Sequence, residues 1–148
     1  MTQRMDYKAI APDGYAAMLQ LRKYVYASGL PHALIYMIEL RVLQINGCAY
    51  CVDLHTRQLR ELGENERRIA CIVTWREAPF YSPRERAALA WTEAITLIAE
   101  DHAPDDVYEE VRRNFTEAEL AAITYAAILM NGFNRLGIGF RLAPAPLE

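Results

Sequence analysis

The chain has 148 residues, the length of one ordinary domain. Its net charge of -3 and the lack of a basic patch give no indication of nucleic-acid binding. No run approaches the roughly 20 apolar residues that span a bilayer, and residues 1–6 lack the apolar segment of a secretory signal. We therefore expect a cytoplasmic protein without membrane association. The hydrophobic fraction of 53% is at the upper end for a globular domain and suggests apolar surface buried between subunits.

The first half of the chain contains four predicted helices with recognisable boundaries. Gly29 ends the first, Pro31 precedes the second, Asn46-Gly47 interrupts the pattern before the third, and Gly63 ends the third. From these signals we expect helices over residues 14–28, 32–44, 48–62 and 64–76.

The second half contains two strong helix starts. Ser82 can cap a helix that has Pro83 at its first position, and Glu85 can complete a capping box. Thr116 and Glu119 have the same relationship. These signals predict helices that begin at residues 83 and 117 and end near residues 100 and 136, with a shorter helix over residues 105–114 between them.

Two features complete the predicted fold. Gly137 and Gly139 are expected to loosen the end of the last helix, and residues 143–148 are expected to form a flexible tail. No segment shows the sustained period-two alternation of a strand. The sequence therefore predicts an all-α fold of about six to seven helices, in one domain over residues 1–148.

The most informative motif is a cysteine pair followed by a histidine, Cys48-x-x-Cys51-x-x-x-His55. On a helix, these offsets place all three side chains on one face. One thiolate can attack a substrate, the other can resolve the product, and the imidazole can move the proton. In a reducing cytoplasm, such a pair is more often catalytic or metal-binding than structural.

The position of the motif at a helix start favours a reactive thiol. Asn46 and Gly47 precede the helix, so we expect Cys48 in its first turn. Free backbone N–H groups and the positive end of the helix dipole stabilise an anion there and lower the pKa of a thiol. On this geometry Cys51 is the cysteine closer to His55.

Glu39 on the preceding helix is a candidate partner of the histidine. If the two helices pack side by side, its carboxylate could orient or charge His55. The alternative is an ordinary ion pair of Glu39 with Arg41 or Arg60. Both interpretations remain open at the level of the sequence.

Two other interpretations of the motif are open. It could hold zinc through three ligands on one helix, or the two thiols could be an inert reduced pair.

Other polar and sulfur-containing residues have simpler interpretations. Cys71 lies in an apolar run and is interpreted as a small buried hydrophobe. Asn131, Asn134 and Arg135 lie in an apolar helix and need partners, either on the motif helix or on another subunit.

Four segments of the chain resemble a known family. The central match is Leu40-Arg41-Val42-Leu43-Gln44-Ile45-Asn46-Gly47-Cys48-Ala49-Tyr50-Cys51-Val52-Asp53-Leu54-His55, with further matches at residues 75–78, 85–94 and 131–136. Together they are similar to the AhpD-like alkylhydroperoxidases of the carboxymuconolactone decarboxylase superfamily. The resemblance implies an all-helical fold that assembles into homotrimers or homohexamers.

The resemblance also implies roles for the motif residues. Cys51 resembles the thiol that attacks a peroxide, Cys48 the resolving thiol, and His55 a member of a proton relay. A thiol donor then reduces the disulfide. The presence of both cysteines argues against the decarboxylase branch. The family places a relay glutamate twelve residues before the first cysteine, where this chain has Tyr36; Glu39, one helical turn later, can substitute, or the relay is shortened.

These observations predict a thiol-dependent hydroperoxide reductase of antioxidant defence. Its catalytic residues are Cys51, Cys48, His55 and Glu39. It requires no metal, flavin or other cofactor, and its partners are a hydroperoxide and a thiol reductant. One alternative is a general thiol–disulfide oxidoreductase, which a missing relay glutamate favours. The other is a non-catalytic, oligomeric module whose cysteines sense oxidation.

Overall fold

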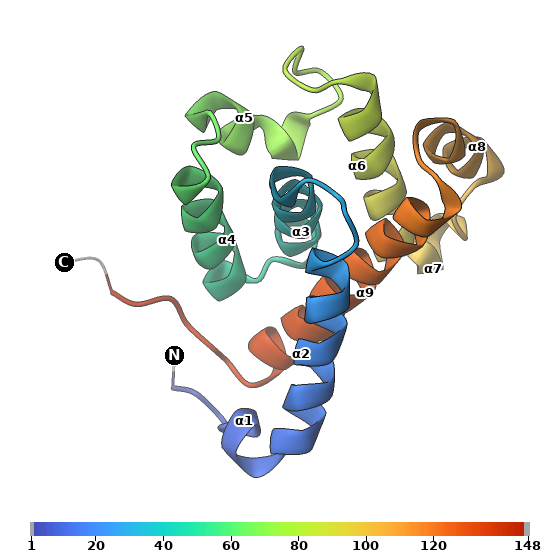
Figure 1. Ribbon diagram of the computed structural model, residues 1–148. Coiled ribbons are helices and arrows are strands. Elements are labelled where there is room, and N and C mark those ends of the chain that lie inside the picture. The colour runs from blue at the N-terminus through green and yellow to red at the C-terminus, as the bar shows by residue number, and fades with distance from the viewer. Residues whose placement is uncertain (1, 147–148) are drawn as a thin grey trace.

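The computed structural model describes residues 2–146, which form nine α-helices, one 3-10 turn and no strand (Figure 1). The elements are α1 (Tyr7–Ile10), α2 (Pro12–Tyr26), α3 (His32–Asn46), α4 (Ala49–Glu61), α5 (Glu66–Cys71), the 3-10 turn (Ile72–Thr74), α6 (Pro83–Thr96), α7 (Ile98–Asp101), α8 (Asp105–Asn114) and α9 (Glu117–Gly139). The all-α class is confirmed, with more helices than the six to seven expected.

The two additional helices are short and have identifiable causes. Asp6 caps α1 by accepting hydrogen bonds from the N–H groups of Lys8 and Ala9. The helix expected over residues 83–100 is interrupted at Leu97, whose backbone leaves the helical conformation before α7 begins. A four-residue helix carries too little periodicity to be recognised in a sequence.

The predicted helix starts in the second half are confirmed. Ser82 Oγ accepts from the N–H of Glu85 at 3.2 Å, and the Glu85 carboxylate accepts from the Ser82 N–H at 2.7 Å. Thr116 and Glu119 form the same reciprocal pair at the start of α9. Each box satisfies two backbone donors that the first helical turn leaves free.

Helix α3 occupies the centre of the fold. It packs against α9, α4 and α6, and Figure 1 shows it surrounded by the other helices. It is buried along most of its length, through Leu34, Ile35, Met37, Ile38, Glu39, Leu40, Val42 and Leu43. A glutamate in the middle of such a run is unusual, because a charged group leaves water at a high cost unless it is partnered.

The two ends of the described chain are joined to each other. The N–H of Arg4 donates to the carbonyl of Phe140 at 2.9 Å, and the Tyr7 ring packs on the Phe140 ring at 5.6 Å. Residues 142–146 have no regular secondary structure, and residues 147–148 of the expected tail lie outside the described residues. None of the described helices combines the length and hydrophobicity needed to span a membrane.

Candidate active site

The site is built at the turn between α3 and α4. Gly47 adopts a left-handed conformation with φ of 72°, and its N–H donates to the carbonyl of Leu43 at 2.9 Å. Because L-residues rarely adopt this conformation, glycine permits the helix to end and the chain to turn back within one residue. The interruption predicted at Asn46-Gly47 is therefore confirmed.

The structure places the two cysteines slightly differently from the prediction. Cys48 is the N-cap of α4 rather than a member of its first turn, and its side chain makes no capping hydrogen bond. Cys51 is the third helical residue, so Cys51 is the cysteine that lies within the first turn. The expectation for Cys48 was wrong by one position because the left-handed glycine delays the start of the helix.

A disulfide joins Cys48 to Cys51, with a Cα–Cα distance of 5.4 Å. That distance lies within the usual range for a disulfide. Both cysteines are buried in a small apolar cluster with Leu43, Leu129 and Met130. After reduction, the first turn of α4 supplies the N–H groups and the dipole that favour a thiolate at Cys51.

Gly137 on α9 faces the sulfur atoms. A Cβ at this position would lie 3.3 Å from Sγ of Cys48 and 3.7 Å from Sγ of Cys51. The residue is buried and α9 continues through it to Gly139, so the expectation that Gly137 loosens the helix end was wrong. Its missing side chain instead lets the α9 backbone pack directly on the disulfide.

His55 lies one helical turn after Cys51, and Glu39 lies beside it. The Nδ1 atom of His55 is 3.0 Å from Oε2 of Glu39, and both side chains are buried. The ion pairs considered for Glu39 are made elsewhere: Arg41 pairs with Glu93 and Arg60 with Glu66, each at 2.6 Å. The structure thus brings all four predicted site residues into one region, with Glu39 against His55.

Tyr26 on α2 completes the surroundings of Glu39 and was missed in the sequence. Its hydroxyl donates to Oε2 of Glu39 at 2.7 Å. Burial, together with the charge of Glu39 and this hydrogen bond, raises the pKa of Tyr26 well above its usual value, so the phenol keeps its proton at neutral pH. Tyr36, at the family's relay position, packs its ring edge-on against His55 at 5.8 Å.

The hydrogen bonding around Glu39 is incomplete within the described part of the chain. Oε1 of Glu39 is buried and has no partner there, and the approach of His55 Nδ1 to Oε2 is close but not aligned as a hydrogen bond. Buried polar groups are normally satisfied, and exceptions concentrate at functional sites. This carboxylate and imidazole are therefore the strongest candidates in the described residues for a functional pair.

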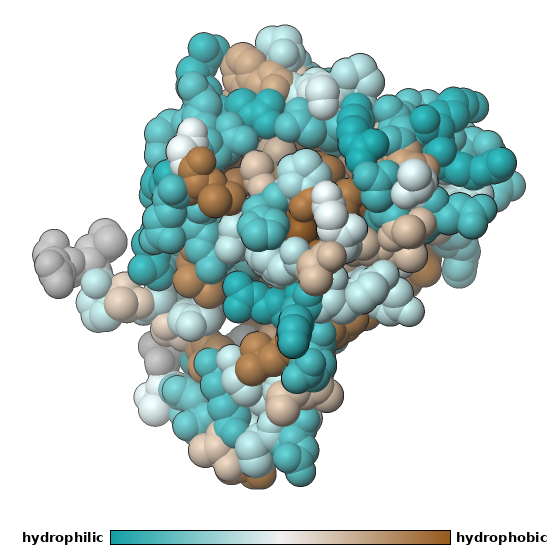
Figure 2. Space-filling view, in the orientation of Figure 1, coloured by the Kyte–Doolittle hydropathy of each residue, from teal (hydrophilic) through white to brown (hydrophobic). Residues whose placement is uncertain are grey.

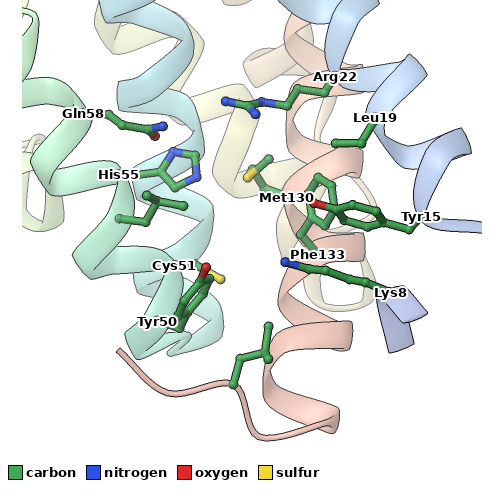
Figure 3. A pocket seen from close by; sticks show the side chains of 12 residues that line it. Lys8, Tyr15, Leu19, Arg22, Tyr50, Cys51, His55, Gln58, Met130 and Phe133 are labelled. Carbon is green, nitrogen blue, oxygen red and sulfur yellow. The ribbon is translucent and has the colours of Figure 1, made fainter. Parts of the chain in front are cut away.

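A cavity of about 140 Å³ opens beside this group and is bounded by α1, α2, α4 and α9 (Figure 3). Cys51 and His55 both line it, together with Gln58, which lies next to His55 in Figure 3. Its apolar lining consists of Leu19, Leu54, Met130, Phe133 and Leu142. A small organic molecule in this cavity would contact the sulfur of Cys51 and the imidazole together.

Cys48 borders a different cavity. This second space, of about 530 Å³, is lined by residues that include Arg4, Ala49, Ile138 and Pro144, and it lies between the start of α4 and the segment after α9. Cys51 does not line it. The two cysteines of one disulfide therefore line two different cavities, which share Leu142.

The remaining polar candidates have structural partners. The Asn46 amide donates to Oδ1 of Asn131 at 3.0 Å and to Oδ1 of Asn134 at 2.9 Å, which fixes the end of α3 to α9.

Cys71 is half-buried on α5, more exposed than the buried hydrophobe that was expected. Within residues 2–146, no group of three or more His, Cys, Asp or Glu side chains is placed to hold a metal ion.

The protein is an all-helical domain with a disulfide-forming cysteine pair. A buried His–Glu contact and a cavity adjoin that pair. These features together are typical of proteins that carry out cysteine chemistry. The chain belongs to the carboxymuconolactone decarboxylase family, whose model matches residues 12–94. The matched range includes Tyr26, Glu39, Cys48, Cys51 and His55. The family resemblance drawn from the sequence is thereby confirmed.

Similar proteins extend this result to the whole chain. YdfG of Bacillus subtilis (strain 168), an uncharacterized protein, is 41% identical over 138 residues, which cover 93% of this chain and 94% of YdfG. The crystal structure of ATU0492 from Agrobacterium tumefaciens, a protein of unknown function provisionally described as the antioxidant defence protein AhpD, is 42% identical. It has a TM-score of 0.94 and covers 99% of this chain and 100% of its own.

A more distant structure shows the same fold. The debrominase Bmp8 has a TM-score of 0.83 at 22% identity, over 93% of this chain and 74% of its own. At this level of identity the likeness shows the fold alone.

Proposed function

We propose that the protein is a thiol-dependent hydroperoxide reductase of the AhpD type. The observation that carries the proposal is that Cys51 and His55 line one small cavity, with Glu39 3.0 Å behind the imidazole and Cys48 bonded to Cys51. This is the set of groups that a two-cysteine peroxidase needs: an attacking thiolate, a proton donor and a resolving thiol.

In the first step, the Cys51 thiolate attacks the terminal oxygen of a hydroperoxide in the cavity. An S–O bond forms and the O–O bond breaks, so that Cys51 becomes a sulfenic acid and the alkoxide leaves. His55 supplies the proton that converts the alkoxide to an alcohol. Glu39 lies beside Nδ1 and would stabilise the imidazolium before this transfer, which leaves Nε2 for the substrate.

In the second step, the Cys48 thiolate attacks the sulfur of Cys51. An S–S bond forms, the S–O bond breaks, and the departing hydroxide is protonated to water. The two thiols have then supplied two electrons to the peroxide, and the product is the disulfide found in the structure. Two electrons from an external dithiol, or from two monothiols, regenerate the reduced pair.

Glu39 takes the part of the relay glutamate in this proposal. The residue twelve positions before Cys48 is Tyr36, which packs against His55 only through its ring. Glu39 lies one helical turn further along α3 and approaches Nδ1 of His55 directly. The relay is therefore displaced by one turn rather than shortened.

The cytoplasmic location and the homotrimeric or homohexameric assembly belong to the same proposal. Cytoplasmic thiol pools would supply the reducing electrons. Several large hydrophobic side chains on α2, α7 and α9 are 44–51% exposed, among them Tyr24, Ile98, Tyr125 and Ile128. Exposed apolar groups of this kind are suited to contacts between subunits.

The alternative of a general thiol–disulfide oxidoreductase is favoured by one observation. Cys48 borders its own, larger cavity on the side away from His55. A disulfide substrate could exchange there without the proton relay. The redox-sensing alternative differs from both, because it requires oxidation to change assembly or partner binding without repeated turnover.

A comparison of substrates and variants tests the proposal. The reduced protein should oxidise faster with cumene hydroperoxide than with an equal concentration of a small-molecule disulfide, and it should turn over repeatedly with dithiothreitol. Cys51→Ser should lose at least about 10³-fold in peroxide turnover, the scale seen when a nucleophile is removed. Cys48→Ser should still react once and stop as a sulfenic acid that dimedone can trap.

Cys71→Ser is the matched control, because Cys71 lies on α5 outside the disulfide. It should keep full turnover. Faster reaction with the disulfide would favour the oxidoreductase, and single oxidation without turnover would favour the sensor. Full peroxidase activity in Cys51→Ser would refute both the proposed role of Cys51 and the proposed mechanism.

A further inference from the structure

The cavity beside Cys51 is asymmetric in charge. Its lining contains one lysine and one arginine, Lys8 and Arg22, and no aspartate or glutamate. Cysteine chemistry with a neutral peroxide requires neither cation. Two positive groups at the edge of an apolar cavity therefore need an explanation beyond the reaction itself.

Lys8 is held at the cavity by an anchored segment. It follows Tyr7, which is 7% exposed and packs against Phe140, while the N–H of Arg4 bonds the Phe140 carbonyl. The amine lies 5.2 Å from the centre of the Tyr15 ring, and Figure 3 shows it directed toward Cys51. Across residues 2–146, no carboxylate lies within 4.0 Å of this amine.

Arg22 approaches the cavity from α2. Its guanidinium lies 5.0 Å from the centre of the Tyr26 ring and points toward His55 and Gln58 in Figure 3. It makes no ion pair with any carboxylate that the structure describes, including the nearby Glu39. Its N–H donors are thus available to a molecule in the cavity.

An apolar surface lines the same cavity, and in Figure 3 Met130 and Phe133 lie between Arg22 and Lys8. It is formed by Leu19, Met130 and Phe133, and the face shown in Figure 2 is hollowed between α2 and α4, where hydrophobic and hydrophilic side chains meet. A ligand that fits this arrangement has a small apolar body and one anionic group. The volume of about 140 Å³ restricts that body to a few carbon atoms or a single ring.

We infer that the cavity selects small amphipathic hydroperoxides that carry a carboxylate, which Lys8 and Arg22 bind while the peroxide group reaches Cys51. The inference rests on the proposed function and names its substrate class. The two positive groups would attract the carboxylate from α1 and α2, and the apolar body would lie on the Phe133 side. An exposed or half-buried cation contributes modestly to binding, so the preference should be measurable but not absolute.

A second effect of the same cations has to be separated from substrate binding. Positive charge near Cys51 also lowers the pKa of a thiol and would accelerate its reaction with every peroxide. Substrate recognition changes the reaction with a carboxylate alone, whereas thiol activation changes the reaction with charged and neutral substrates equally. A matched pair of substrates distinguishes the two.

The test measures kcat/KM for cumene hydroperoxide and for its para-carboxylate derivative. The wild-type protein should prefer the carboxylate by about tenfold or more at low salt, and the preference should fall as salt is added. Lys8→Gln and Arg22→Gln should each reduce kcat/KM for the carboxylate about fivefold more than kcat/KM for the neutral substrate.

Two control variants sharpen the test. Lys23→Gln removes the same charge from an exposed position on α2 that does not line the cavity, so the preference should persist. Arg22→Lys retains a cation and should restore most of the preference lost in Arg22→Gln. An equal loss on both substrates, or no preference in the wild-type protein, would overturn the inference while leaving the peroxidase proposal intact.

Binding to the disulfide form keeps the test independent of peroxidase activity. The alcohol products of the two substrates are unreactive, and their affinities can be compared by calorimetry. The para-carboxylate alcohol should bind more tightly than the neutral alcohol, and Lys8→Gln should reduce the difference. If neither hydroperoxide is reduced, the proposed function fails, whereas equal affinities for the two alcohols contradict the anion site itself.

Discussion

Two buried glutamates differ in their surroundings, one bound by arginines and the other in the proposed active site. Glu93 on α6 is 7% exposed and accepts hydrogen bonds from Arg41, Arg76 and Trp75. Burial by itself would raise the pKa of Glu93, but the hydrogen bonds from Trp75 and the two arginines outweigh it and hold that pKa below its usual value. Glu93 is a permanent anion that joins α3, α6 and the turn before α6.

Glu39 on α3 is fully buried, yet it lacks such partners. Its contacts are the Tyr26 hydroxyl at 2.7 Å and Nδ1 of His55 at 3.0 Å, and neither arginine nor lysine lies within ion-pair distance among the described residues. The comparison teaches that burial alone does not mark a functional carboxylate. The distinguishing feature is burial beside a titratable group with hydrogen-bonding capacity left unused.

The largest effect that we expect from a substitution in this pair is a loss of stability at Glu93. Glu93→Gln should lower the free energy of unfolding by about 3 kcal/mol, because it leaves the largely buried Arg41 without its charge partner. Peroxide turnover per folded molecule should change little. Urea denaturation measures the first quantity, with Glu66→Gln as the control because its pair with Arg60 is solvent-exposed. An unchanged unfolding midpoint in Glu93→Gln would contradict the structural role.

The opposite pattern is expected at Glu39. Glu39→Gln should slow oxidation of Cys51 by about 10²-fold, since a general acid–base group contributes about that factor or more. Its stability should stay the same or increase, because a poorly partnered buried charge is replaced by a neutral amide. Stopped-flow oxidation and urea denaturation report the two quantities on the same preparation.

A double variant checks that Glu39 acts through His55. His55→Asn should slow the reaction by a similar factor, and the double variant should be no slower than His55→Asn alone, because the two residues act as a unit. Additive losses would show that Glu39 contributes independently of the imidazole.

The pH dependence of stability distinguishes the glutamates more finely. The pKa of Glu93 is lower in the folded protein than in the unfolded chain, so its contribution is fully present above the unfolded value near 4.3 and is lost as the pH falls through the folded value. The wild-type protein should therefore lose stability below about pH 4 more steeply than Glu93→Gln. Parallel curves for the two proteins, measured by urea denaturation at each pH, would be inconsistent with a fixed anion at this site.

The smallest expected effect concerns Tyr26. Tyr26→Phe removes the hydroxyl that donates to Glu39 and should slow Cys51 oxidation by about fivefold, the equivalent of one hydrogen bond. Tyr24→Phe is the matched control on the same helix, since Tyr24 is exposed and packs on Tyr125, and it should keep the wild-type rate. An equal loss of rate in Tyr24→Phe, or an unchanged rate in Tyr26→Phe, would contradict the proposed role of the Tyr26 hydroxyl.

The part of the fold that could be predicted from the sequence is the part determined locally. Capping boxes at Ser82 and Thr116, and the glycine at position 47, mark helix ends through neighbouring residues alone. Helix α1 could not be predicted, because four residues carry too little periodicity, although Asp6 caps them locally.

The residues of the candidate site also fall into those that the sequence predicts locally and those whose contacts depend on helix packing. Cys48, Cys51 and His55 share a helical segment, so their spacing was enough to predict that they lie together. The family resemblance and helical periodicity placed Glu39 near them. Tyr26 gave no signal, because its hydrogen bond to Glu39 depends on how α2 packs on α3. Gly137 lies 86 residues after Cys51 by sequence number, and only the packing of α9 reveals its contact with the sulfur atoms.

The most direct test of the central claim is the mass of the reduced protein before and after one equivalent of an organic hydroperoxide, with peptide mapping. We predict the loss of two hydrogen atoms within seconds and a single bridge between Cys48 and Cys51, with Cys71 still free. Thiols that remain free, or that oxidise only as slowly as an ordinary exposed cysteine, would contradict the assignment of this cavity to peroxide reduction.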